Sequence, residues 1–319
     1  MIAAARDRAA RIGEWVWEAR RSAYARGWLK PHRVDARVVS IGNLSVGGAG
    51  KTTLCLHLAR AAVRAGTPAA VVCRRYRPGP GGEGDEERLM RRELNGVPVL
   101  AGRSKWRLAD AGAAAGAKLI LVDDGFSHWA LARDLDLVLI EARDLAGGTR
   151  MLPAGRLREP WRALQRATFV IASRVEADQD PGPLLARLAR AAPGAGLAAG
   201  RHALRGVRGL EGGAVEAGGR ARVVTATGNP GAVARSMTEA GFEVSALAAY
   251  RDHHWFTRAE AERERAAAAR DHARLLLTPK DAVRWPLPPS DDVAVLDVSW
   301  TWLAGGEAVE RAVLDGVFR

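Results

Sequence analysis

The sequence predicts an α/β fold in which a parallel-sheet domain is followed by a second, smaller α/β domain. From Ala36 to about residue 202, short apolar strands alternate with helical stretches, a rhythm typical of a parallel sheet covered by helices on both faces. A glycine-rich stretch without helical period follows at 203–219, and the alternation then resumes over 220–319. A length of 319 residues fits two domains, at roughly 100–200 residues per domain.

Residues 1–30 predict an amphipathic helix. One face is defined by apolar residues at helical spacing, namely Ile12, Trp15, Val16, Ala19 and Ala23. Another side carries Trp17, Tyr24 and Trp28, flanked by Arg20, Arg21 and Lys30. Aromatic rings at headgroup depth, with guanidinium groups beside lipid phosphates, indicate a helix that docks on a membrane surface through this second side. The alternative is a helix packed on the domain along two seams.

The first predicted domain spans 31–202 and the second spans 220–319, and apolar strands are expected to form the sheet of each. In the first domain, strands are expected at 36–42, 69–73, 97–102, 118–124, 135–142 and 168–173. In the second domain, strands are expected at 220–228, 242–250, 273–278 and 292–300. The stretch 203–219 between the two domains is expected to form a hairpin linker.

The chain is strongly basic, with 48 Lys and Arg residues against 36 Asp and Glu residues and a net charge of +12. Such a surface favours anionic partners, namely nucleic acid, acidic lipid headgroups or phosphorylated substrates, and an arginine-rich genome is the alternative explanation. Cys55 and Cys73 are not placed for a structural disulfide or a metal cluster, which fits a reducing cytosol. Since the sequence has no run of about 18 apolar residues, neither a spanning helix nor a cleaved signal is expected.

A glycine-rich loop between a strand and a helix predicts a nucleotide site. It consists of Ser45, Val46, Gly47, Gly48, Ala49, Gly50, Lys51, Thr52 and Thr53. The glycines let backbone amides approach a phosphate, the lysine reaches the outer phosphates, and the hydroxyl of Thr52 can bind Mg²⁺. Ser45 stands where the standard pattern has its first glycine. That position is the outermost one, and the positions that touch phosphate are all present.

Asp123 and Asp124 end an apolar strand and predict a metal site. In P-loop enzymes a carboxylate at such a place holds Mg²⁺, directly or through water. Because successive side chains of a strand point in opposite directions, only one of the two is expected to face the metal unless the strand has ended. A pair of solvated turn acids before Gly125 is the alternative.

Three further polar groups have structural explanations when each is taken alone. Asp85 opens a predicted helix and fits a helix cap. Asn229 and Pro230 fit the first positions of another helix. His253 and His254 stand together in a loop, and no third and fourth ligand follows at the spacing of a metal site.

Together these motifs resemble the tetraacyldisaccharide 4'-kinase family, the kinases of lipid A synthesis. The resemblance runs nearly from end to end, through GNLSVGGAGKTT, GDE, VDDGFSHWALARDLDLVLI, LPAGRLREP, TGNP, DHHWFT and LLTPKDAVR in the family's order. The family also has a small hydroxyl residue at the position of Ser45. The resemblance implies a P-loop kinase-like parallel-sheet domain, a smaller α/β domain joined to it by a two-stranded linker, and a catalytic cleft between the two.

The resemblance also implies a reaction, the transfer of the γ-phosphate of ATP to the 4'-hydroxyl of a tetraacylated glucosamine disaccharide 1-phosphate. The product would be lipid IVA. The cofactors would be ATP and Mg²⁺, and the partners would be the lipid substrate and the inner-membrane surface, with no nucleic acid and no stable protein partner. The enzyme would lie peripherally on the cytoplasmic face of the inner membrane through its N-terminal helix.

Matching positions imply roles for the residues singled out above. The phosphate and metal residues would be Lys51, Thr52, Asp123 and Asp124. Asp85 and His253 would form the pair that activates the sugar hydroxyl, with His254 as the alternative histidine. Since Asp85 and His253 belong to different predicted domains, they are expected to meet only when the cleft closes. Candidates for binding the 1-phosphate or the nucleotide are Arg74, Arg75, Arg77 and Arg103, and the loop at 76–84 is shorter than the family's.

A P-loop GTPase or metallochaperone that uses the same loop as a nucleotide switch is the alternative function. It predicts a guanine-reading Asn-Lys-x-Asp motif, which the chain lacks. A basic nucleic-acid-binding protein is a third class, and the sequence has no zinc-finger, RRM or comparable motif to support it.

Overall fold

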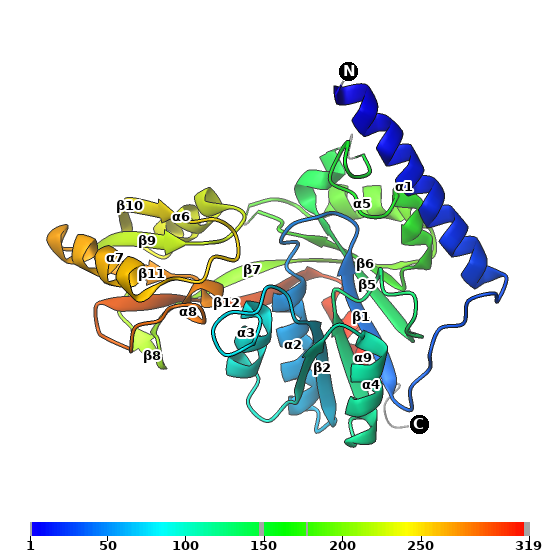
Figure 1. Ribbon diagram of the computed structural model, residues 1–319, viewed down its shortest axis with the longest axis horizontal. Coiled ribbons are helices and arrows are strands. Elements are labelled where there is room, and N and C mark those ends of the chain that lie inside the picture. The colour runs from blue at the N-terminus through cyan, green and yellow to red at the C-terminus, as the bar shows by residue number, and fades with distance from the viewer. Residues whose placement is uncertain (1, 147–149, 177, 316–319) are drawn as a thin grey trace. The chain divides into compact units, whose positions relative to one another are not determined.

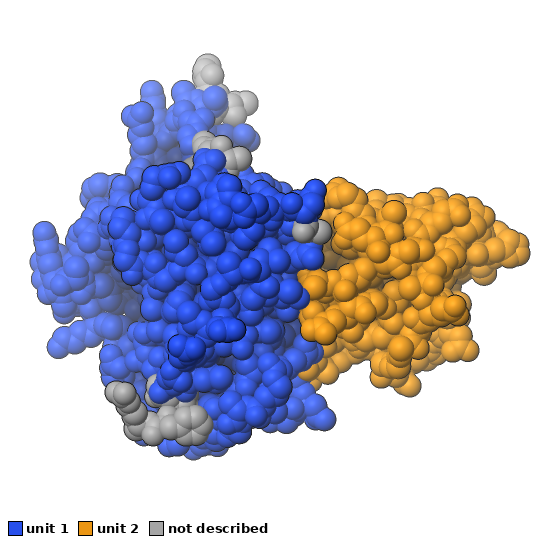
Figure 2. All heavy atoms as spheres, turned by 180° about the vertical axis from the view of Figure 1, so that it is seen from behind, with its two compact units in different colours: residues 1–74, 94–201, 300–319 blue, residues 75–93, 202–299 orange. Residues whose placement is uncertain are grey.

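A computed structural model describes residues 2–146, 150–176 and 178–315 (Figure 1). The chain forms two compact units, coloured separately in Figure 2: unit 1 comprises Met1–Arg74, Leu94–Arg201 and Trp300–Arg319, and unit 2 comprises Arg75–Glu93 and His202–Ser299. Two segments group differently from the predicted domains. Arg75–Glu93 was predicted in the first domain and belongs to unit 2, and Trp300–Arg319 was predicted in the second domain and belongs to unit 1. Residue 1 of the predicted N-terminal helix and residues 316–319 of the second predicted domain lie outside the described residues.

Unit 1 contains the predicted parallel sheet, with strand order β7-β6-β5-β1-β4-β2-β3. Its strands are β1 (Arg37–Asn43), β2 (Ala69–Arg74), β3 (Val99–Gly102), β4 (Leu119–Asp123), β5 (Leu135–Glu141), β6 (Phe169–Ser173) and the start of β7 (Gly196–Gly209). Its helices are α1 (Ile2–Ala25), α2 (Lys51–Arg64), α4 (Lys105–Ala114), α5 (Gly182–Ala191) and α9 (Gly306–Leu314), with 3-10 turns at Ala142–Ala146 and Trp161–Arg166. Every residue of β4 and β5 is buried, as expected of central parallel strands covered on both faces.

The sheet of unit 1 positions the candidate site. β1 pairs in parallel with β4 on one side and with β5 on the other. The register places Ile41 of β1 opposite Asp123 of β4. Because the carboxyl ends of parallel strands meet at one edge, the loop after β1 and the aspartates that end β4 lie together there. The α/β fold class predicted from the alternation of strands and helices is therefore confirmed, and it explains why the two motifs become neighbours.

Unit 2 has a smaller parallel sheet, with strand order β10-β9-β11-β12. Its strands are β9 (Arg220–Thr225), β10 (Glu243–Ala249), β11 (Arg274–Leu277) and β12 (Val293–Ala304), and β8 (Gly212–Val215) pairs antiparallel with β7. Its helices are α3 (Asp85–Glu93), α6 (Pro230–Glu239), α7 (Arg258–Arg270) and α8 (Pro279–Ala282). The strands β7 and β12 each begin in one unit and end in the other. The side chain of Asn229 caps α6, as predicted.

The N-terminal helix α1 packs through a different face from the one predicted. Trp17 is 7% exposed, whereas Ile12 is 64% and Trp15 is 71% exposed. The rings of Trp17 and Tyr24 both lie against Trp129, and the indole N–H of Trp17 donates to buried Glu159 at 2.8 Å. The prediction that Trp17 and Tyr24 face outward was wrong, because specific partners elsewhere in unit 1 decide which of two apolar stripes is covered.

Candidate active site

The glycine-rich loop of unit 1 is shaped for close approach by an anion. β1 ends at Asn43 and α2 begins at Lys51, so the loop leads directly into a helix N-terminus. Gly47 and Gly50 have φ values of 125° and 93°, which residues with a side chain rarely adopt. The first turn of α2 carries no acidic residue. The amides and the helix dipole at this end of a 14-residue helix therefore suit a phosphate group.

The side chain of Ser45 anchors the glycine-rich loop. This is the residue that departs from the standard loop pattern. Its side chain is buried, and its hydroxyl donates to buried Asp144 at 2.8 Å. Arg156 completes the anchor, because its guanidinium donates to Asp144 at 3.2 Å and to the carbonyl of Val46 at 2.9 Å. A glycine at this position would lose the bond to Asp144. The serine therefore holds the loop in place.

Lys51 belongs to a polar network at the carboxyl edge of the sheet. Its ammonium donates to Asn43 at 2.9 Å and lies 3.5 Å from the Asp124 carboxylate. Arg158 donates to both oxygens of Asp124, at 2.7 and 2.9 Å, and also contacts Asn43. Burial alone would raise the pKa of Asp124, but the hydrogen bonds from Arg158 and the charge of Lys51 hold it well below its usual range. Asp124 is therefore ionised at neutral pH.

Both aspartates of the predicted metal site face the loop. β4 ends at Asp123, whose carboxylate accepts from the hydroxyl of Thr52 at 3.3 Å. Asp124 has left the strand with a φ of 52°, and its carboxylate faces Lys51 and Arg158. A hydroxyl with two carboxylates fits Mg²⁺, which is commonly held by one or two carboxylates together with phosphate oxygens and waters. Thr52, Asp123 and Asp124 would hold the ion. Among the described residues, no group of three His, Cys, Asp or Glu side chains suits a metal.

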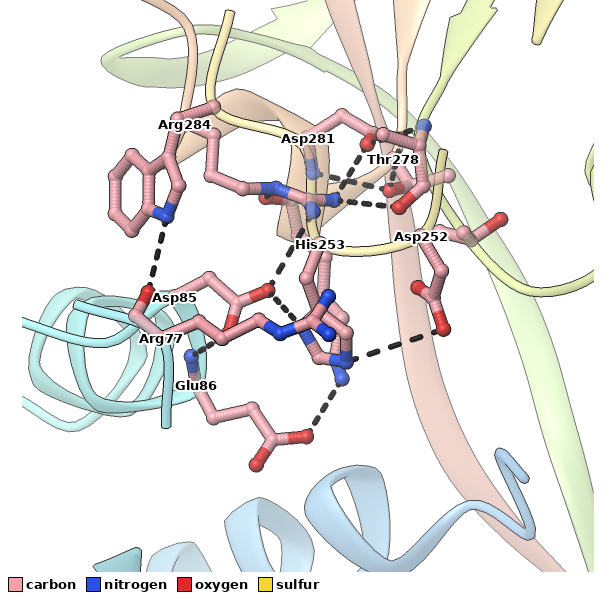
Figure 3. A network of polar contacts seen from close by, with 12 residues as sticks. Arg77, Asp85, Glu86, Asp252, His253, Thr278, Asp281 and Arg284 are labelled. Carbon is pink, nitrogen blue, oxygen red and sulfur yellow. Dashed lines mark hydrogen bonds and ion pairs between the residues drawn. The ribbon is translucent and has the colours of Figure 1, made fainter. Parts of the chain in front are cut away.

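Unit 2 contains the second half of the predicted site, a hydrogen-bonded pair of Asp85 and His253 (Figure 3). The Nδ1 atom of His253 lies 2.8 Å from the Asp85 carboxylate, which is only 3% exposed. The expectation that these residues meet only on closure between domains was wrong, because α3, which begins at Asp85, belongs to the same unit as His253. α3 packs against α8, and this packing brings two segments far apart in the sequence together.

Cationic neighbours keep Asp85 ionised. Burial raises its pKa, but the hydrogen bond with His253 and the charges of Lys280 and Arg284 outweigh burial and lower the pKa to about 2. Arg284 is itself buried, lies 3.5 Å from the Asp85 carboxylate and donates to Asp281 at 2.7 Å. Lys280 donates to Glu86, the residue after Asp85, at 2.7 Å. Figure 3 shows the side chain of Arg284 pointing toward Asp85.

The two neighbouring histidines have different surroundings. His253 has a φ of 61° and uses Nδ1 toward Asp85, while its Nε2 lies 3.9 Å from Asp252. His254 stacks on Tyr250, and its Nε2 lies 2.9 Å from Glu260. Glu260 also closes the capping box of α7. The environment of His254 is therefore explained by the start of a helix.

The four candidate arginines lie in different places. Arg75 donates through Nε and Nη2 to Glu87, at 2.8 and 2.9 Å, which secures α3. Arg77 is exposed, and its carbonyl accepts from the indole of Trp255 at 3.2 Å. The remaining two, Arg74 and Arg103, are exposed at the ends of β2 and β3.

Sequence reasoning missed several residues of both sites. In unit 1 these are Asn43, Lys105, Asp144, Arg156 and Arg158, and in unit 2 they are Lys280, Asp281 and Arg284. The motifs LPAGRLREP and LLTPKDAVR contain five of them and carried no assigned role. The charged residues of these two motifs were the available signal.

A parallel sheet with a glycine loop, a lysine and a hydroxyl at the helix start, and aspartates on the neighbouring strand defines the class of P-loop phosphate-binding proteins. Within this class, the chain belongs to the tetraacyldisaccharide-1-P 4'-kinase family, whose model matches residues 9–317.

Individual relatives agree with the family. A protein of Anaeromyxobacter dehalogenans strain 2CP-C named tetraacyldisaccharide 4'-kinase is 38% identical over 91% of this chain and 84% of its own length. A protein of the same name from Anaeromyxobacter sp. strain Fw109-5 is 38% identical over 83% of this chain and 78% of its own. LpxK from Aquifex aeolicus, solved in complex with ATP, has a similar fold over 100% of both chains, with a TM-score of 0.79 at 23% identity. The family favours a kinase over the alternative of a nucleotide switch.

Proposed function

We propose that this protein transfers the γ-phosphate of ATP to the 4'-hydroxyl of a tetraacylated glucosamine disaccharide 1-phosphate. The observation that carries the proposal is the arrangement of Lys51 and Thr52, at the start of α2, opposite Asp123 and Asp124 in a chain of this family. Lysine at a P-loop reaches the outer phosphates, and phosphoryl transfer depends mainly on positioning and charge neutralisation. Mg²⁺ would supply Lewis-acid polarisation of the phosphate oxygens.

The residues of unit 1 would bind and orient the nucleotide. Backbone amides of the loop and the start of α2 would bind phosphate oxygens, since Gly47 and Gly50 carry no side chain of their own and have positive φ values. Lys51 would move its ammonium from Asn43 and Asp124 toward the transferred phosphoryl group. While the ammonium of Lys51 moves, the hydrogen bonds from Arg158 keep Asp124 ionised. The site therefore keeps its negative charge for the metal during the reaction.

Asp85 and His253 would activate the sugar hydroxyl. With Nδ1–H donated to the Asp85 carboxylate, Nε2 of His253 is the basic nitrogen and can accept the proton of the 4'-hydroxyl. Asp85 then stabilises the imidazolium that forms. His253 fits this role better than His254, whose Nε2 faces Glu260 at the start of α7. For the reaction, this pair must take the proton from the same hydroxyl that receives the γ-phosphate of the bound nucleotide.

The proposed reaction is tested by incubating the purified protein with Mg²⁺, γ-labelled ATP and the tetraacylated disaccharide 1-phosphate in detergent. We expect label to appear in the lipid, and we expect none when the acceptor lacks its 4'-hydroxyl. Label released only as inorganic phosphate, with neither acceptor changing its rate, would reject the kinase and favour the nucleotide switch.

We also propose that α1 docks on the lipid surface through its outward face. Ile12, Trp15 and Val16 are exposed there, at 64%, 71% and 53%. The acidic residues of α1 are paired with arginines: Asp7 with Arg150, Glu14 with Arg162, and Glu18 with Arg21 and Arg162. An apolar face on an arginine-rich helix suits an anionic bilayer. No helix among the described residues is long and apolar enough to cross a membrane.

Replacement of Trp15 by serine should weaken binding to anionic vesicles roughly 10-fold or more, because the variant lacks the exposed indole that would insert at the membrane interface. Cosedimentation with phosphatidylglycerol vesicles measures the effect. Val63→Ser is the control, since Val63 is an exposed apolar residue of α2, 52% accessible, and its loss should leave vesicle binding unchanged. Equal binding by Trp15→Ser and the parent protein would rule out this docking face.

A further inference from the structure

Lys105, the first residue of α4, is a buried lysine at an unusual place. Its side chain is 6% exposed, and burying an ammonium is costly unless it is paired. A lysine at a helix N-terminus also opposes the helix dipole, which favours anions at that end. Neither the packing nor the stability of α4 therefore explains a lysine here, and an apolar residue of similar length would suit both better.

The ammonium of Lys105 binds the turn that follows β4. It donates to the carbonyl of Asp123 at 2.7 Å and to the carbonyl of Asp124 at 2.5 Å. In an extended strand successive carbonyls point in opposite directions, so one ammonium cannot bind both. Here both are within reach because Asp124 adopts a left-handed conformation with a φ of 52°.

This turn is what brings both carboxylates to the phosphate loop. Asp123, still in the strand, faces Thr52, and Asp124 faces Lys51 and Arg158. If the strand continued through Asp124, its side chain would point to the other face of the sheet.

The left-handed conformation of Asp124 needs support from its surroundings. For a residue other than glycine it costs roughly 1–2 kcal/mol. Gly125, the next residue, sits against β1, and a Cβ there would lie 2.8 Å from the Cβ of Ser40. The amide of Gly125 also donates to the carbonyl of Ile41 at 3.1 Å. The turn is thus held on one side by the sheet and on the other by Lys105.

We infer that Lys105 is a positioning residue of the nucleotide site, which fixes the Asp123–Asp124 turn so that both carboxylates serve one magnesium ion. This inference rests on the proposed function, because it takes the turn as the Mg²⁺ site of a bound ATP. Lys105 acts through the backbone of the two aspartates and touches neither nucleotide nor metal. The charges of the two carboxylates partly offset its positive charge.

The test is the Mg²⁺ dependence of nucleotide binding, followed with a fluorescent ATP analogue on the full chain. Lys105→Met keeps the length and removes the donors, and it should raise the Mg²⁺ concentration for half-maximal binding about 10-fold or more, as for other residues that orient metal ligands. Lys105→Arg, which keeps charge and donors, should recover most of this loss. Binding in EDTA should change much less, because the loop amides and Lys51 remain.

Lys118→Met is the matched control, since Lys118 is an exposed lysine directly before β4. It should match the parent protein. A double variant of Lys105→Met with Asp124→Asn should show less than the sum of the single effects, because both act on one turn. If Lys105→Met does not fold, Lys105→Gln, which keeps a polar donor, should shift the Mg²⁺ midpoint about 3-fold or more on the same reasoning.

The outcomes separate this inference from the proposed function. A parent protein that binds the analogue no better with Mg²⁺ than in EDTA would contradict the proposed nucleotide site. A parent protein with clear Mg²⁺ dependence, and folded Lys105 variants with the same midpoint, would contradict only the role of Lys105. A fall in thermal stability with an unchanged midpoint would assign Lys105 to packing alone and would equally overturn the inference.

Discussion

Replacement of Lys51 by methionine should lower kcat for lipid phosphorylation by about 10³-fold or more. The reason is electrostatic, because charge moves onto the transferred phosphoryl group in the transition state and a positioned cation beside it is worth several kcal/mol in a site shielded from water. Lys51 is suited to this task since it is only 15% exposed and is already held by Asn43 and Asp124 at the edge of the loop. Methionine keeps the length of the side chain and removes the charge.

Steady-state phosphorylation of the lipid, with ATP binding measured separately, checks this expectation. The loss should appear mainly in kcat, with a smaller change in ATP affinity, because the loop amides still bind the phosphates. Arg64→Met is the control, as Arg64 is an exposed basic residue in the last turn of the same helix. If Lys51→Met kept a tenth of the parental kcat, the assignment of the loop as the site of phosphoryl transfer would be wrong.

The parts of this protein that the sequence predicted are those encoded over short distances. Strand and helix periods are local, and so are the glycines before Lys51 and the two aspartates that end β4. These patterns were enough for the parallel sheet, the loop and the position of the two aspartates beside the loop, because parallel strands bring their carboxyl ends to one edge. The bond of Ser45 to Asp144, 99 residues away, had no local signal.

What could not be predicted depends on contacts between distant segments. Arg158 meets Asp124 across 34 residues, and Asp85 meets His253 across 168. The face of α1 that packs was also undetermined, since apolar residues lie on two of its sides. Trp17 is buried because Glu159 and Trp129 provide partners for its N–H and its ring. Lys105 was missed because a buried lysine looks like any other charged residue in a helix until its carbonyl partners are known.

Replacement of Asp85 by asparagine should lower kcat by about 10²- to 10³-fold while ATP binding stays at the parental level. Asparagine fills the same space, but it cannot stabilise the imidazolium that forms when His253 takes a proton, and general-base catalysis contributes about this much. His253→Gln should cause a similar loss. Because the two residues act as one unit, the double variant should be little worse than either single one.

The lowered pKa of Asp85 predicts how the contribution of this residue to folding stability changes with pH. The folded pKa, about 2, lies below the ordinary value of 3.8, so the charged form stabilises the fold above pH 3.8, and this contribution disappears as the pH falls through 2. The difference is worth about 2 kcal/mol at neutral pH. The loss of stability in Asp85→Asn should therefore be present at neutral pH and vanish near the folded pKa, as chemical denaturation at several pH values would show.

Glu260→Gln is the matched control for this pair, because Glu260 lies 2.9 Å from Nε2 of His254 just as Asp85 lies 2.8 Å from Nδ1 of His253. Glutamine can still serve in the capping box of α7, so the helix should be retained. If His253 is the base, Glu260→Gln phosphorylates the lipid at nearly the parental rate while Asp85→Asn does not. The reverse ranking would transfer the role to His254, and two fully active variants would remove the Asp–His pair from the reaction and leave phosphoryl transfer to Lys51 and the metal.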